Sequence, residues 1–135
     1  MNMLKSKILI LSLTILTLLL FIGCGNNYKH ISQEEAIKIM ETQKDYIIVD
    51  VRRKEEYDKK HIPNAILVPI EDIREGKLDA LPDKDKMLLI YCWTGRRAED
   101  AAVLLAKYGY TNVYEFGGLV NWTGDVEVEK VAAEN

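Results

Sequence analysis

The sequence contains few of the residues that build metal sites and disulfide frameworks. Its 135 residues include two cysteines, Cys24 and Cys92, and two histidines, His30 and His61. Two thiols cannot supply the several disulfides of a small stapled fold, and no Cys/His cluster has the spacing of a zinc site. The sequence also has no internal repeat, and its length suits one domain. We therefore predict a single domain with neither a metal ion nor another cofactor.

The sequence also lacks a run of basic residues. Its 18 lysines and arginines are outnumbered by 21 acidic residues, which gives a formal net charge of −3. Proteins that bind nucleic acid concentrate positive charge on one face, because phosphate contacts supply most of their affinity. We therefore expect no nucleic-acid partner.

Only the N-terminus carries an extended apolar run, and that run is short. Residues 8–22 contain no charged residue, Lys5 and Lys7 precede them, and Gly23 and Cys24 follow. A membrane-spanning helix needs about 20 apolar residues, whereas this order of charged, apolar and small residues is typical of a secretory signal. An uncleaved membrane anchor remains the alternative.

The segment Phe21-Ile22-Gly23-Cys24 resembles the end of a bacterial lipoprotein signal, although Phe21 stands where that family usually has leucine. The resemblance implies that residues 1–23 are a signal peptide and that Cys24 carries lipid such as palmitate. Residues 24–30 would then be a tether, and the protein would be anchored at the extracytoplasmic face of the cell membrane. Cys92 would have no intramolecular partner, and a Cys24–Cys92 disulfide is the alternative.

Strand-like and helix-like patterns alternate through residues 31–123. Apolar or β-branched runs predict strands at 46–51, 66–68, 87–91 and 112–116. Helical spacing or helix signals predict helices at 33–43, 52–60, 71–74 and 97–108, the first with Ser32 as N-cap and Glu35 completing a capping box. This alternation predicts an α/β fold with a mostly parallel sheet and helices on both faces, followed by an acidic tail at 124–135.

Cys92 occupies a chemically special place in this pattern. It directly follows the predicted strand at 87–91, and the helix at 97–108 begins a few residues later. Backbone N–H groups at a helix N-terminus lack intrahelical partners, and the helix dipole is positive there. Successive loop amides can also form a concave anion site. A thiolate is stabilised in such surroundings, so Cys92 is the candidate nucleophile.

Three segments of the chain together resemble the rhodanese family of sulfurtransferases. The first matches its active-loop pattern Cys-x-x-Gly-x-Arg with Cys92, Gly95 and Arg97. The second matches its Asp-x-Arg and later motifs with Asp50, Arg52, Glu56, Tyr57, His61, Ile62 and Ala65. The third is Gly117-Gly118 followed by Trp122. Lys60 and Asn64 depart from the pattern, since the family usually has glycine at both places.

The resemblance implies a single rhodanese-like domain over residues 31–123 that is a monomer and transfers sulfane sulfur. Cys92 would attack a small sulfur donor, form a persulfide, and pass the outer sulfur to a thiol or to cyanide. The substrate-binding residues would be Trp93, Thr94, Gly95, Arg96 and Arg97. Either arginine could orient the loop while the other attracts the donor. Trp93 stands at a position that is often basic in members that use thiosulfate, which favours a bulkier or less charged donor.

Two other classes of function remain open from the sequence. A cysteine phosphatase also places cysteine and arginine around an amide cradle, but with five intervening residues, whereas Cys92 and Arg97 enclose four. A non-catalytic module could instead use the thiol to bind a partner or to sense oxidants. The matched polar residues also have structural interpretations: Asp50 and Arg52 as an ion pair, Glu56 as a cap or local partner, and His61 as a hydrogen-bonded turn residue.

Overall fold

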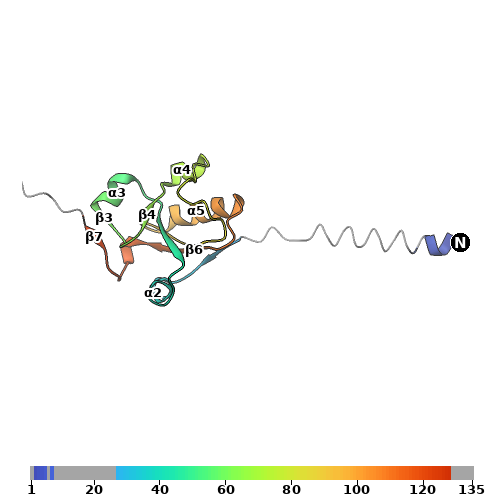
Figure 1. The fold of residues 1–135 in the computed structure, drawn as a ribbon, viewed down its shortest axis with the longest axis horizontal. Coiled ribbons are helices and arrows are strands. Elements are labelled where there is room, and N and C mark those ends of the chain that lie inside the picture. The colour runs from blue at the N-terminus through green and yellow to red at the C-terminus, as the bar shows by residue number, and fades with distance from the viewer. Residues whose placement is uncertain (1, 6, 8–26, 129–135) are drawn as a thin grey trace, which may run out of the picture.

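A five-stranded parallel sheet forms the centre of the protein. The computed structural model describes residues 2–5, 7 and 27–128 (Figure 1). The sheet order is β1-β6-β5-β2-β4, and every neighbouring pair is parallel. The strands are β1 (Tyr28–His30), β2 (Tyr46–Asp50), β4 (Ile66–Leu67), β5 (Met87–Cys92) and β6 (Val113–Gly118). The strand that ends in Cys92 is therefore the central one.

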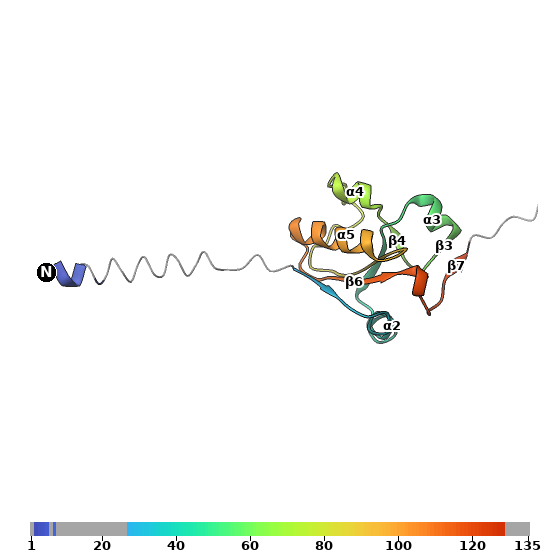
Figure 2. The same cartoon turned by 180° about the vertical axis from the view of Figure 1, so that it is seen from behind.

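Helices cover both faces of this sheet, as the alternating sequence pattern predicts. Figures 1 and 2 show α2 (Gln33–Thr42) on one face, and α4 (Ile70–Arg74) and α5 (Arg96–Lys107) on the other. Helix α3 (Lys54–Lys59) follows β2, and a short 3-10 helix, η1 (Leu119–Asn121), follows β6. Parallel neighbours require crossover connections, and the helices provide them. The predicted α/β class and single domain are confirmed.

Two hydrophobic cores lie on the two faces, and β5 contributes to both. Leu88, Ile90 and Cys92 belong to the core beneath α4 and α5, whereas Leu89 and Tyr91 belong to the core on the α2 side. Successive strand residues point to opposite faces, so a strand covered on both sides needs an unbroken apolar run. This explains why residues 88–91 are continuously apolar and why all four are completely buried.

The helix signals in the sequence have the predicted geometry. The Ser32 hydroxyl accepts the Glu35 N–H at 3.1 Å, and the Ser32 N–H donates to the Glu35 carboxylate at 2.8 Å, so the capping box is complete. Gly109 adopts a φ of 91° directly after Tyr108, the C-cap residue of α5. Glycine reaches this left-handed conformation without the steric penalty of a Cβ atom, which makes it a good helix terminator.

Two predicted boundaries are wrong. Residues 28–30, assigned to the tether, form β1, which pairs in parallel with β6 and packs Tyr28 against the α5 side of the core. Glu127 and Val128, assigned to the tail, form β7, which pairs antiparallel with β3 (Lys60–His61). Both strands are two or three residues long, and their polar sequences resemble linkers. Only pairing with a distant strand defines them. Residues 129–135 of the tail and residues 24–26 of the tether lie outside the described part of the chain.

The two positions where the related family usually has glycine differ in backbone conformation. Asn64 has a φ of 64°, a left-handed value that asparagine tolerates better than most residues. Lys60 is extended, with a φ of −166° and a ψ of 130°. Any residue adopts that conformation, so lysine at position 60 causes no backbone strain.

Candidate active site

Cys92 is held between the end of β5 and the beginning of α5. Its side chain is a free thiol with only 1% of the residue surface exposed. The Gly95 N–H donates a hydrogen bond to the Cys92 Sγ at 3.0 Å, and Gly95 reaches this position with a φ of 105°. The sulfur therefore lies against a loop amide at the N-terminus of a helix of three turns. Such an environment favours a negatively charged sulfur.

The glycine pair Gly117-Gly118 at the end of β6 packs against this loop. The Val120 N–H donates to the Trp93 carbonyl at 3.0 Å, which ties the loop to the segment that follows Gly118. A Cβ atom on Gly118 would lie 2.2 Å from the Trp93 carbonyl oxygen and 2.7 Å from the Thr94 nitrogen. No side chain fits there, so glycine at 118 allows the two backbones to pack directly against each other.

Arg97 is paired with Glu56, a residue 41 positions earlier in the chain. Its Nη1 and Nη2 atoms donate to the two Glu56 carboxylate oxygens at 2.8 and 2.9 Å. These hydrogen bonds lower the pKa of Glu56 to about 2. They also raise the pKa of Arg97, and the charge of nearby Cys92 adds to that rise. A two-point contact of this kind fixes both the position and the plane of the guanidinium.

The structure separates the two arginines that the sequence left interchangeable. Arg97 is partly buried and bound to Glu56, whereas Arg96 is exposed and has no ion pair within the described residues. Thr94 is exposed, and Trp93 exposes 40% of its surface. The two arginines thus differ in their surroundings, since Glu56 holds the Arg97 guanidinium and the Arg96 side chain faces solvent.

The ion pair expected of Asp50 and Arg52 is present and almost completely buried. The Arg52 Nε and Nη2 atoms donate to the Asp50 carboxylate at 2.9 and 2.7 Å, and Nη2 also donates to the Lys60 carbonyl at 2.6 Å. The pair connects the end of β2 to β3. It contacts backbone at both ends, which confirms the structural interpretation of these two residues.

His61 also has a structural position. Its ring stacks on Tyr57 with the centroids 3.9 Å apart, its Nδ1 lies 2.8 Å from the Tyr57 carbonyl, and its Nε2 lies 3.2 Å from a Glu127 carboxylate oxygen. These partners occupy both ring nitrogens. His61 therefore joins α3 to β7, and the hydrogen-bonded interpretation describes it better than a general base does.

Three residues that sequence reasoning missed support the Gly117-Gly118 segment. The Gln33 side-chain amide donates to the Gly118 carbonyl at 2.8 Å, the Gly117 N–H donates to the Glu115 carboxylate at 3.1 Å, and His30 contacts the same carboxylate. Glu115 is 5% exposed. They come from α2, β6 and β1, and no local signal links them to Cys92. The only indication in the sequence was the charged residue Glu115 within the otherwise apolar strand β6.

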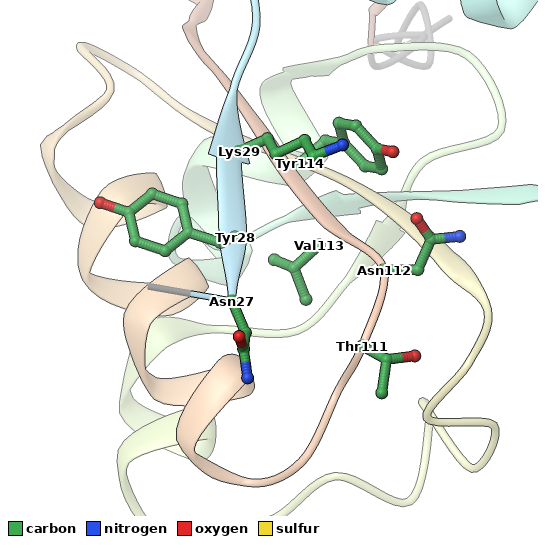
Figure 3. A pocket seen from close by; sticks show the side chains of 7 residues that line it. All are labelled: Asn27, Tyr28, Lys29, Thr111, Asn112, Val113 and Tyr114. Atoms are coloured by element: carbon green, nitrogen blue, oxygen red, sulfur yellow. The ribbon is translucent and has the colours of Figure 1, made fainter. Parts of the chain in front are cut away.

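Two grooves of the protein lie away from Cys92. One of about 450 Å³ lies at the beginning of β1 and β6, where Lys29 reaches over the Tyr114 ring (Figure 3). Another of about 480 Å³ is lined by residues of α2 and by Trp122. Neither groove is lined by a residue from 93 to 97, so neither opens onto the loop beside Cys92. Within the described ranges no three His, Cys, Asp or Glu side chains form a possible metal site.

The structure is a parallel α/β sheet with a buried free cysteine at the carboxyl end of its central strand, and the carboxyl ends of the strands are the usual ligand position in such sheets. The chain matches the model of the Rhodanese-like domain over residues 32–125, and it belongs to that family.

Known relatives agree with this membership. The chain is 38% identical over 71 residues to the thiosulfate sulfurtransferase PspE of Escherichia coli K12, which covers 53% of this chain and 68% of PspE. It is 34% identical over 96 residues to the thiosulfate sulfurtransferase GlpE of Coxiella burnetii, which covers 70% of this chain and 87% of GlpE. A crystal structure of a rhodanese-like domain protein from Staphylococcus aureus superposes with a TM-score of 0.65 and 32% identity, over 76% of this chain and 99% of that one. These relatives support a sulfurtransferase type of activity.

Proposed function

We propose that this protein transfers sulfane sulfur through a persulfide on Cys92. The observation that carries the proposal is the 3.0 Å contact between the Gly95 N–H and the Cys92 Sγ at the N-terminus of α5. This contact stabilises negative charge on sulfur before and after the transfer. The names of the PspE and GlpE relatives support the same class of reaction.

The reaction has two displacements on sulfur. In the first, the Cys92 thiolate attacks the outer sulfur of thiosulfate or of an organic persulfide. A bond forms between Cys92 Sγ and that sulfur, and sulfite or a thiolate leaves with the electrons of the broken bond. In the second, an acceptor thiolate or cyanide attacks the outer sulfur, and the Cys92 thiolate leaves. Charge and atoms balance in each step, so no further reductant or oxidant is required.

The loop residues have distinct roles in this proposal. The amides of residues 93–97 hold the charge of the persulfide, Arg97 orients the loop through Glu56, and Arg96 attracts the donor. The phosphatase alternative is less suited to this geometry. Four residues between Cys92 and Arg97 make a small ring, and the guanidinium that would bind a phosphate is already engaged by Glu56.

Mass spectrometry of donor-treated protein tests the proposal. We expect one added sulfur atom on Cys92 after exposure to thiosulfate or glutathione persulfide, and its loss after cyanide or a thiol is added. Cys92→Ser should remain folded, because serine is close to isosteric, but it cannot form a persulfide. Sulfur transfer at the wild-type rate by Cys92→Ser would rule out the mechanism. An inert wild type that dephosphorylates an aryl phosphate would favour the phosphatase, and reversible oxidation alone would favour a sensor.

We also propose that the domain is lipid-anchored through Cys24 at the extracytoplasmic face of the membrane. The signal pattern between Lys5 and Cys24 supports this proposal. Cys24 itself lies outside the described residues, and none of the described helices has the length and apolarity to cross a membrane. Expression of the full chain with and without Cys24→Ala is the test. Membrane-bound wild type that keeps residues 1–23 and carries no acyl group would refute the proposal.

A further inference from the structure

The side chain of Lys60 lies beside the loop that carries the nucleophile. Its Nζ is 5.5 Å from the centroid of the Trp93 ring, within the range of a cation–π contact. Trp93 directly follows Cys92 and exposes 40% of its surface, whereas Cys92 is almost completely buried. A molecule that approaches the loop over the exposed Trp93 therefore meets the Lys60 ammonium.

The backbone of Lys60 is fixed by three independent contacts. Its N–H donates to the Glu56 carbonyl at the end of α3, and its carbonyl accepts from the buried Arg52 at 2.6 Å. It also pairs with Val128 in the two-stranded β3–β7 sheet, which Figure 1 shows at the end of the molecule near α3. The ammonium therefore extends from a rigid base, and only the side-chain torsions are free.

Within the described part of the chain, Lys60 has no ion pair, although the protein as a whole is acidic. Arg96, at the start of α5, is exposed and equally unpaired. Within the described residues, two cations without an ion pair, Lys60 beside Trp93 and Arg96 three residues after it, thus accompany the exposed indole of the loop that carries the buried thiol. An anion gains most from such a place, and a cation is repelled by it.

We infer that Lys60 is a specificity-determining residue, whose ammonium beside Trp93 selects sulfur donors that carry negative charge outside the transferred sulfur. The inference rests on the proposed sulfur transfer and names its donor class. It also revises the expectation drawn from Trp93. Trp93 stands at a loop position that is often basic in members that use thiosulfate. Lys60, at the α3–β3 corner where related domains usually have glycine, supplies a cation in its place, so the donor can be fully anionic.

Two small persulfides of similar size and opposite charge provide the test. The persulfide of 3-mercaptopropionate carries a carboxylate, and the persulfide of cysteamine carries an ammonium. The rate constant for sulfur loading of Cys92 is measured with each donor for the wild type, Lys60→Gln and Lys60→Arg. Lys59→Gln is the matched control, because Lys59 is exposed and its loss changes the net charge equally.

We expect Lys60→Gln to lower the rate with the anionic donor about fivefold, the effect of one partly exposed charge pair. The rate with the cationic donor should stay the same or rise, and Lys60→Arg should keep the wild-type preference. The ratio of the two rates is the decisive quantity, because a distorted loop would slow both donors together. An equal change with both donors, no change, or the same change in Lys59→Gln would overturn the inference.

A binding measurement separates this inference from the proposed function. Thiosulfate is titrated into Cys92→Ser while the Trp93 indole N–H signal is followed by NMR, with Trp93→Phe used to assign it against Trp122. We expect the signal to shift saturably as thiosulfate binds. The dissociation constant obtained from this shift should rise about fivefold when Lys60→Gln is added. If thiosulfate binds beside Trp93 but the wild type forms no persulfide, the proposed sulfur transfer is wrong and the anion site at Lys60 stands. Persulfide formation with an unchanged charge preference would remove the anion site alone.

Discussion

The ion pair between Glu56 and Arg97 offers a sharp test of how the loop is held. Replacing Glu56 with glutamine keeps the size of the side chain and removes its charge. The folded protein lowers the pKa of Glu56 from 4.5 to about 2, chiefly through the hydrogen bonds from Arg97. At about 1.4 kcal/mol for each pKa unit, this shift corresponds to at most about 3 kcal/mol of stability. About a third of each side chain is exposed, and solvent screens the pair, so we expect about 1–2 kcal/mol.

The pH dependence of this contribution has a definite sign. Because the pKa is lower in the folded state, ionised Glu56 stabilises the folded protein above the unfolded-state pKa of about 4.5. The contribution falls as the pH drops from about 4.5 toward 2, and it is lost below pH 2, where the carboxylate is protonated in both states. Glutamine cannot titrate, so the difference between wild type and Glu56→Gln should be constant near neutrality and shrink in acid.

Urea unfolding at pH 7, 5, 4 and 3 measures this difference directly. Glu55→Gln serves as the matched control, since Glu55 is an exposed neighbour on the same helix, and its removal should change stability by less than about 0.5 kcal/mol. The reasoning would be refuted by equal stabilities of wild type and Glu56→Gln at pH 7. A difference that stays the same down to pH 3 would also refute it, because the effect would then be packing and not charge.

Substitutions at three further positions probe the site and its support. Gly118→Ala should cost about 1–3 kcal/mol in urea unfolding and slow persulfide formation, because the new methyl group would meet the Trp93 carbonyl at 2.2 Å; normal activity would contradict the tight packing. Arg97→Lys should load sulfur faster than Arg97→Ala and slower than wild type, since lysine keeps the charge and loses the two-pronged contact; rates equal to wild type would show that charge alone suffices. Asp50→Asn should lower the free energy of unfolding by about 3–5 kcal/mol, because it leaves the buried Arg52 guanidinium without its counter-charge, and a loss below 1 kcal/mol would show that this pair is dispensable.

The sequence by itself determined the fold class and the position of Cys92 at the end of a strand. The apolar run that ends in Cys92, the capping box at Ser32 and Glu35, and the helical spacing after Arg97 are all local patterns. Each depends on residues within a few positions of one another, where periodicity and capping follow from backbone geometry. Their alternation was sufficient to predict a parallel sheet with the cysteine at the carboxyl end of a strand.

Only the tertiary structure decided how the loop is held and what surrounds it. The pairing of Arg97 with Glu56, the backbone contact between Trp93 and Gly118, and the approach of Lys60 to Trp93 join residues more than 20 positions apart. The short strands β1 and β7 likewise exist only through their distant partners. Such contacts depend on how the helices and strands pack in three dimensions, and no local pattern of residues encodes that packing.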